Sequence, residues 1–96
     1  MEGIINIISK KWALLIIGTI SNNGKLRFNK ILKELSGVSP KTLTDRLKEL
    51  ELAELIKREA FPEIPPRVEY SLTHDGIEVR NAMIPLMEWA YKKSIR

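Results

Sequence analysis

Hydrophobic side chains near the start of the chain recur at helical spacing and on more than one face. Ile5, Ile8, Trp12 and Ile16 form one stripe, with steps of three and four residues that match the period of an α-helix. Further apolar residues widen this stripe, namely Ile4, Leu14, Leu15, Ile17 and Ile20. We therefore predict one helix over residues 4–20 that is covered from two directions, by the core of its own domain and by a second copy of the chain.

A turn and a short helix follow. Residues 21–24 are Ser, Asn, Asn and Gly, which predict a stop and a turn, and residues 25–27 fit a very short strand. A helix over about residues 28–35 is predicted by apolar positions at steps of three and four, namely Phe28, Ile31, Leu32 and Leu35. Gly37 then ends this helix, because glycine adopts a positive φ at little cost.

The next segment predicts a second helix, over residues 39–50, with two distinct faces. Ser39 is a favoured N-cap residue, and Pro40 suits the first helical position, where no backbone donor is missed. Leu43, Leu47 and Leu50 form an apolar stripe, and the opposite face carries Lys41, Asp45 and Lys48. Two helices of this size, joined by a turn at residues 36–39 that contains a glycine, are typical of a helix-turn-helix.

After Glu51 the hydrophobic period changes from near 3.6 to 2. The segment between the two predicted strands contains Pro62, Pro65 and Pro66. In the strands the two faces alternate as follows: Ile56, Arg58 and Ala60 with Lys57, Glu59 and Phe61, then Val68, Tyr70 and Leu72 with Arg67, Glu69 and Ser71. This pattern predicts a two-stranded hairpin with a stiffened loop. Thr73 then caps a final helix, in which Pro85 predicts a kink or a break. A hairpin directly after a helix-turn-helix describes a winged helix, so we expect a mainly α fold with a small β-hairpin.

Composition and charge narrow the class of protein. The 96 residues, 44% hydrophobic and 29% charged, fit a single globular domain over residues 1–96. Residues 1–48 carry nine basic and three acidic groups, whereas residues 49–96 carry seven and nine. A basic half suits a polyanion, because each neutralised phosphate releases condensed counterions. The other interpretation of the charge is a solvated basic surface.

Other features exclude several kinds of protein. The apolar run at residues 12–20 is shorter than the ~20 residues of a membrane span. It follows Lys10 and Lys11, but Glu2 lies upstream and no small-residue cleavage site follows, so we expect no export signal and a cytoplasmic location. His74 has no second imidazole, cysteine or clustered carboxylate to complete a metal site or a nucleophile and base pair. The chain has no phosphate-binding glycine loop either, so we expect no enzyme activity, no metal and no cofactor.

Several motifs resemble the HxlR-type winged-helix regulators of bacteria and archaea. They are, in order, SKKWALLIIGTI (9–20), LRFNKILKEL (26–35), GVSPKTLTDRLKELELAELIKRE (37–59), FPEIPPRVEYSLTHDG (61–76) and MEWA (87–90). The resemblance implies a homodimer built from the first and last helices, a second helix of the helix-turn-helix in the DNA major groove, and a wing on flanking backbone or minor groove. Many members carry a cysteine shortly before the segment that matches KKW, and some use it to sense electrophiles or oxidants. This mode is excluded here because the sequence has no cysteine.

From these inferences we assign candidate contacts with double-stranded DNA. The candidates for reading bases are Ser39, Lys41, Thr42, Thr44 and Asp45. Asp45 could accept from a cytosine amino group or orient Lys41 or Lys48. The candidates for phosphate contacts are Arg46 and Lys48 in the same helix, Lys57 and Arg58 in the first wing strand, and Arg27, Asn29 and Lys30 at the start of the short helix. Arg67, beside Pro66 at the predicted tip, could enter a narrow minor groove or bind a phosphate.

The first and last helices supply the candidates for the dimer interface. These are Ile5, Ile8, Trp12, Ile16, Met83, Ile84, Met87 and Trp89. A cavity between these helices could hold an effector, but no residue specifies one. An alternative function, a winged helix that binds another protein, would favour large apolar groups on the outward face of the second helix, where Lys41 and Lys48 lie instead. RNA or single-strand binding would require exposed stacking aromatics, and most of the six aromatics lie on core faces.

Overall fold

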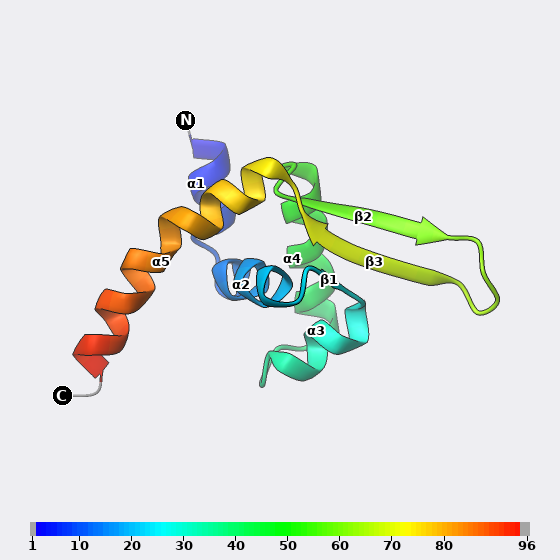
Figure 1. Cartoon of the computed structure of the whole chain (residues 1–96), viewed down its shortest axis with the longest axis horizontal. Helices are drawn as coiled ribbons and strands as arrows, with labels where there is room; N and C mark the ends of the chain where they lie inside the picture. Colours follow the sequence, from blue (N-terminus) through cyan, green and yellow to red (C-terminus); the bar gives the residue numbers. More distant parts are fainter. Residues whose placement is uncertain (1, 95–96) are drawn as a thin grey trace.

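The computed structural model describes residues 2–94 as a helical body with one long hairpin (Figure 1). Its elements are α1 (Glu2–Ile8), α2 (Ala13–Asn23), β1 (Lys25–Leu26), α3 (Phe28–Glu34), α4 (Pro40–Leu52), β2 (Ile56–Phe61), β3 (Arg67–Leu72) and α5 (His74–Ser94). The strands form an antiparallel sheet in the order β1-β3-β2. The expected winged helix-turn-helix is therefore confirmed, with α3 and α4 as its two helices and β2 and β3 as the wing.

The prediction of one helix over residues 4–20 was wrong, because the chain forms two helices with a tight turn between them. Trp12 adopts a φ of 81°, in the left-handed region, and the Ala13 N–H donates to the Lys10 carbonyl across the turn. Both halves keep apolar residues at helical spacing, so periodicity alone does not reveal the break. At its other end α2 includes residues 21–23, and Gly24, with a φ of 79°, ends it by donating its N–H to the Ile20 carbonyl.

The hydrophobic core lies where α2 crosses the helix-turn-helix. Its fully buried side chains are Ile16, Ile17, Ile20, Ile31, Leu43, Leu50 and Ile56. The leucine stripe of α4 is thus buried as predicted, which fixes the direction in which the opposite face points. Ile16 was expected at a dimer interface, and this was wrong, because its side chain has no exposed surface within its own chain.

The local signals that begin the helices are confirmed. Ser39 is the N-cap of α4, and its Oγ accepts from the Thr42 N–H at 3.1 Å. Thr73 Oγ1 accepts from the Gly76 N–H at the start of α5 and donates to the Glu54 carbonyl at 2.6 Å. Pro85 was predicted to kink or break the last helix. The helix is not broken there, because α5 continues through this residue, and its ribbon changes direction along its length (Figure 1).

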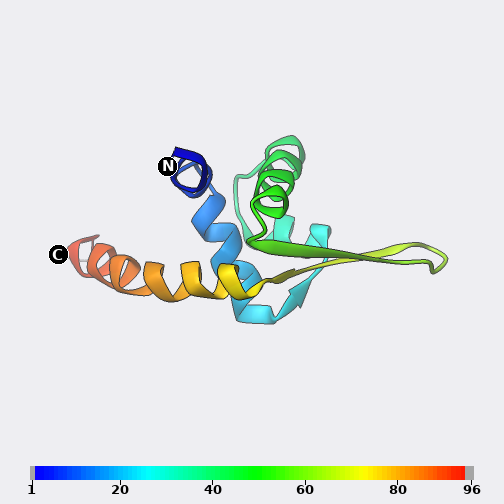
Figure 2. The ribbon, with the colours of Figure 1, turned by 90° about the horizontal axis from the view of Figure 1, so that it is seen from above.

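The elements divide the molecule into two ends. Figure 2 shows α1 and most of α5 on one side and the wing extending on the other. The helix-turn-helix lies between them, with α4 beside the base of the wing. No helix within residues 2–94 is both long enough and apolar enough to span a bilayer.

Candidate nucleic-acid interface

The outward face of α4 carries the polar side chains that the sequence assigned to base contacts. The Lys41 side chain is 85% exposed, and its Nζ lies 3.2 Å from Oδ2 of Asp45, one turn further along the helix. Thr44 and Lys48 are also exposed. The leucines on the other side of α4 are buried, so these groups project from a helix whose position is fixed by the core.

The hydroxyl groups at the start of α4 are partly engaged within the chain. Ser39 Oγ accepts from the Thr42 N–H and donates to Thr42 Oγ1 at 3.0 Å. Thr44 Oγ1 donates to the Pro40 carbonyl at 2.9 Å. Because a hydroxyl has one hydrogen, Ser39 and Thr44 remain acceptors in this arrangement, which suits the amino groups of adenine and cytosine.

Arg46 does not lie where the sequence suggested. Its Nε donates to the Lys11 carbonyl at 3.2 Å and its Nη1 to Oε1 of Glu49 at 3.0 Å, which leaves 21% of the side chain exposed. The Lys10 Nζ approaches the other oxygen of Glu49 at 2.8 Å. Arg46 therefore connects α4 to the turn between α1 and α2, and its guanidinium is engaged within the chain. Sequence reasoning missed this group because its partners lie up to 39 residues apart.

Lys10 and Arg46 change the pKa of the Glu49 carboxyl. The hydrogen bond from Lys10 is the largest effect and lowers the pKa of the Glu49 carboxyl. The positive charges of Arg46 and Lys10 lower this pKa further, while partial desolvation opposes them. Glu49 is therefore held as a carboxylate that joins α4 to the turn between α1 and α2.

A cleft of about 400 Å³ lies between α4 and the wing, and we call it the α4 cleft. Its lining residues are Phe28, Thr44, Leu47, Lys48, Glu51, Arg58 and Tyr70. Three predicted DNA contacts, Thr44, Lys48 and Arg58, thus meet although they come from α4 and β2. Lys57, next to Arg58, lies on the other face of β2 because successive strand residues alternate, and its Nζ is 3.7 Å from Glu59.

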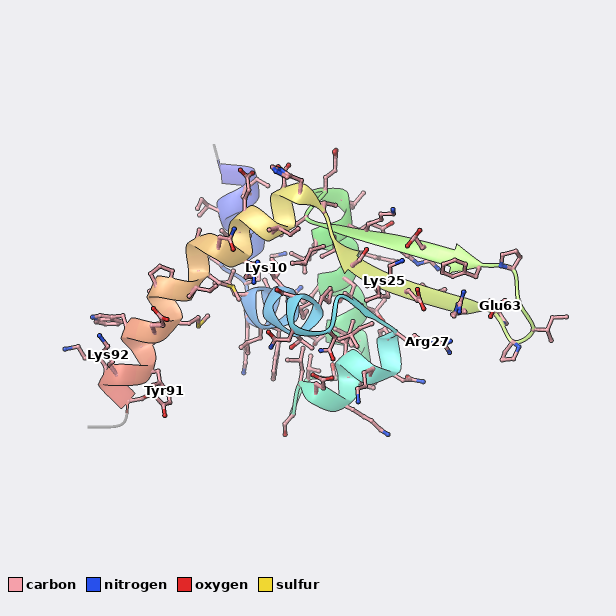
Figure 3. All side chains as sticks on the ribbon, viewed as in Figure 1. Lys10, Lys25, Arg27, Glu63, Tyr91 and Lys92 are labelled. Atoms are coloured by element: carbon pink, nitrogen blue, oxygen red, sulfur yellow. The ribbon has the colours of Figure 1, made fainter. Side chains whose placement is uncertain are left out.

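A second cleft, of about 470 Å³, lies along β1 and α3 and is here called the α3 cleft. Its lining residues are Lys25, Leu26, Arg27, Asn29, Lys30, Lys33 and Glu69. The predicted group of Arg27, Asn29 and Lys30 is therefore brought together, beside Lys25 and Lys33, which were not assigned as contacts. The uneven charge along the sequence was the signal for these two lysines. Figure 3 shows Lys25 and Arg27 near the base of the wing.

Arg67 is the first residue of β3 and is held against its own wing. Its Nη2 lies 3.1 Å from Glu63, its Nε lies 3.8 Å from Glu69, and its guanidinium carbon is 4.1 Å from the centre of the Phe61 ring. The side chain is only 30% exposed. Arg67 was predicted to contact DNA from beside Pro66, and in the structure two carboxylates and an aromatic ring, none of them adjacent to it in the sequence, pair with its charge and partly cover it.

The residues assigned to a dimer interface differ in exposure. Ile5, Ile84, Met87 and Trp89 are exposed, whereas Ile8, Trp12 and Met83 pack partly against the core. The sequence did not assign several other exposed apolar side chains on the same helices, namely Ile4, Leu15, Leu86 and Tyr91. Tyr91 and Lys92 lie near the end of α5, away from the helix-turn-helix (Figure 3).

The space between α2 and α5 gives little support for an effector site. The cleft there measures about 180 Å³ and is lined by Leu14, Leu15, Gly18, Thr19, Asn22, Met83 and Met87. Ligand pockets usually enclose about 300–1,000 Å³. Met83 also fills the space above Gly18, where an added Cβ would lie 3.0 Å from its terminal carbon.

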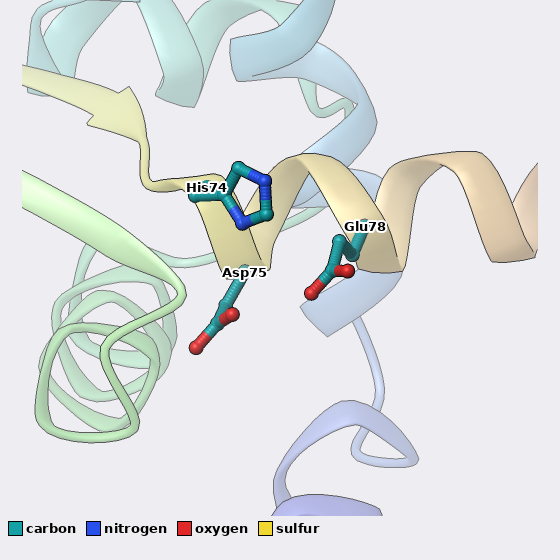
Figure 4. Close-up of side chains that lie close together, drawn as sticks. All are labelled: His74, Asp75 and Glu78. Carbon is teal, nitrogen blue, oxygen red and sulfur yellow. The ribbon is translucent and has the colours of Figure 1, made fainter.

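His74 has carboxylate neighbours that the sequence analysis did not recognise. Ligand atoms of His74, Asp75 and Glu78 lie within 4.8 Å of one another (Figure 4). The statement that no clustered carboxylate accompanies His74 was therefore wrong, since the first turn of α5 brings the three side chains together. All three are exposed, and the two acidic groups suit the positive end of the helix dipole.

Comparison of the sequence with known proteins also points to a helix-turn-helix protein. The family model described as HxlR-like helix-turn-helix matches residues 7–95. The chain is 43% identical over 89 residues to an HTH-type transcriptional regulator of Methanothermobacter thermautotrophicus, covering 93% of this chain and 67% of that protein. It is 40% identical over 86 residues to the HTH-type transcriptional regulator sll1512 of Synechocystis, covering 90% of this chain and 63% of that protein. It thus spans about two thirds of the length of these two curated relatives.

A solved structure shows the same similarity in three dimensions. The reduced form of the transcriptional regulator YodB from Bacillus subtilis superposes with a TM-score of 0.81 at 36% identity, covering 94% of this chain and 87% of that one. The match includes the helix-turn-helix, the wing and most of α5. The chain therefore belongs to the HxlR-like helix-turn-helix family and is a DNA-binding transcriptional regulator, not an enzyme.

Proposed function

We propose that this regulator recognises a specific, pseudo-palindromic site on double-stranded DNA, and that α4 reads its bases. The observation that carries this proposal is the outward face of α4, where Lys41, Thr44 and Lys48 are exposed above a buried leucine stripe. A B-DNA major groove is ~12 Å wide and admits one helix, whose N-terminal residues then face base edges. Lys41 and Thr44 are the candidates for specificity, with Asp45 holding Lys41 in position.

The two clefts beside α4 suit the DNA backbone. Lys48 and Arg58 line the α4 cleft, and Arg27 and Lys30 line the α3 cleft at the start of the first helix of the helix-turn-helix. Backbone contacts of this kind fix the register of a protein on a duplex without reading its sequence. We therefore assign base recognition to the start of α4 and salt-dependent affinity to the clefts.

We further propose that the regulator acts as a homodimer, in the cytoplasm with the DNA it binds. Exposed apolar side chains gather on α1 and α5, among them Ile5, Ile84, Met87 and Trp89. Large exposed apolar surfaces mark interaction sites, and this one lies at the opposite end from the wing (Figure 2). A two-fold dimer through α1 and α5 would direct both wings outward. Its half-sites would lie about one helical turn, ~34 Å, or a multiple of it apart.

Matched lysine substitutions test the assignment of contacts. Lys41→Ala should change which base pair is preferred in the half-site. Lys30→Ala should weaken all duplexes alike and reduce the slope of affinity against salt by about one. Lys92→Ala, near the far end of α5, should change neither property. Binding of the chain to duplexes from its own upstream region, titrated with salt, gives both readouts.

Some outcomes would contradict the assignment. If Lys41→Ala and Lys30→Ala had indistinguishable effects, base contacts and backbone contacts would not be divided as proposed. If the wild type bound every duplex equally, α4 would not read sequence, and the winged helix would fit a protein-interaction module better.

The dimer has a separate test. Ile84→Glu introduces a charge into the exposed apolar surface of α5 and should reduce the solution mass from about twice 11.0 kDa to the single-chain value. Leu52→Glu is the matched control. Like Ile84, Leu52 is an exposed aliphatic side chain, but it lies at the end of α4 and not on α5. A monomeric wild type, or a dimer unaffected by Ile84→Glu, would exclude this interface.

A further inference from the structure

The wing ends in an apolar side chain that the proposed base and phosphate contacts do not use. Ile64 is 101% exposed and lies in the loop at residues 62–66, between Pro62 and Pro65. Three prolines restrict the loop backbone, and the Glu63 N–H donates to the Phe61 carbonyl at 2.8 Å. The loop therefore holds an isoleucine in solvent at a well-defined position, although burial of such a side chain is favourable.

The charges around this tip cancel one another. The wing, residues 56–72, carries three basic and three acidic side chains. Lys57 pairs with Glu59, and Arg67 pairs with Glu63 and Glu69. The carboxylate of Glu63, next to Ile64, is thereby neutralised and would not be repelled by phosphates. A DNA contact made by this tip therefore depends on apolar surface, not on a free cation.

The reach of the wing brings the tip beyond the α4 cleft. Each of its strands has six residues, which at ~3.4 Å per residue extend about 20 Å. This exceeds the ~12 Å width of the major groove that would receive α4. If one DNA backbone passes through the α4 cleft, the wing is therefore long enough for its tip to reach the neighbouring minor groove.

We propose that Ile64, supported by Pro65, is an apolar wedge that enters the minor groove beside each half-site and favours a deformable base step there. This inference rests on the proposed binding of double-stranded DNA. Apolar side chains inserted between base steps unstack them, and the cost is least at flexible pyrimidine–purine steps such as TA. Arg67 is then a positioning residue, because it neutralises Glu63 and holds the base of the loop.

The test compares duplexes that share half-sites and differ only in the flanking step, TA or GC. The wild type should prefer the TA flank by roughly tenfold, because partial burial of an isoleucine side chain is worth about this factor and is gained only where the base step opens at low cost. Ile64→Ala should remove this preference and leave the slope of affinity against salt unchanged, because no phosphate contact is lost. Leu52→Ala, which truncates another highly exposed side chain at the end of α4, away from the tip of the wing, should retain the preference.

The outcomes separate this inference from the proposed function. Equal flank preference in the wild type and Ile64→Ala, with half-site recognition intact, would overturn the wedge alone. A lower salt slope in Ile64→Ala would also overturn it, since the contact would then be electrostatic. A wild type that binds neither duplex would refute the wedge together with DNA recognition by α4.

Discussion

The ion pairs around Glu49 join the turn before α2 to α4, and the substitution Glu49→Gln removes them while keeping the shape of the side chain. Two interactions are lost, at 2.8 Å to Lys10 and at 3.0 Å to Arg46. Each involves partly exposed groups, for which an ion pair contributes about 0.2–1 kcal/mol. We expect a total loss of about 1 kcal/mol in the free energy of unfolding at neutral pH, which corresponds to about 4–8 °C in Tm for a domain of this size.

The dependence of this loss on pH tests its cause. The pKa of Glu49 is lowered in the folded protein. Its contribution is therefore fully present above the unfolded pKa, for which the ordinary value is 4.5, and is lost as the pH falls through the lower folded pKa. The difference in stability between wild type and Glu49→Gln should be largest near pH 7 and should diminish below about pH 4.5.

Urea unfolding at several pH values and one fixed protein concentration provides the measurement, because dimerisation would make stability depend on concentration. Glu34→Gln is the control, since Glu34 is an exposed carboxylate at the end of α3 and its replacement should change stability by less than about 0.5 kcal/mol. A stability loss in Glu49→Gln that is the same at pH 3 as at pH 7 would refute the electrostatic reasoning.

Two further substitutions test the local packing that positions α4 and α5. Gly76→Ala should destabilise the fold by about 3 kcal/mol, because the new Cβ would overlap the Leu55 carbonyl oxygen. Gly3→Ala is the control, since its Cβ would meet no atom within 4 Å and should leave Tm nearly unchanged. Equal Tm values for the two variants would exclude the tight contact at Gly76. Ser39→Ala should lower the free energy of unfolding, measured in urea, by about 1 kcal/mol, because the Thr42 N–H loses its hydrogen-bond acceptor. An unchanged free energy would mean that water fully replaces the hydroxyl.

Much of the fold follows from short-range features of the chain. The leucine stripe and Ser39 cap of α4, the alternation of β2 and β3, and the cap at Thr73 are each signals within a few residues, and the structure contains each of them. Local spacing also gave the polar outward face of α4, because burial of one side of a helix determines the direction of the other. These signals were sufficient for the winged helix and for the start of α4 as the candidate reading surface.

Tertiary structure decided which charged side chains are available to DNA. Arg46 and Arg67 carry the charge that a phosphate contact requires, but both are engaged within the protein. Their acidic partners, Glu49 for Arg46 and Glu63 and Glu69 for Arg67, lie within four residues, whereas the Lys11 carbonyl that accepts from Arg46 lies 35 residues away. The break at Trp12 likewise depends on packing, since the apolar period continues through it. Sequence by itself determined the elements and the direction of their faces, because these depend on neighbours along the chain. Clefts and contacts between helices depend on residues that only folding brings together, and only the folded chain shows which local ion pairs form, so the exposed cations could be identified only in three dimensions.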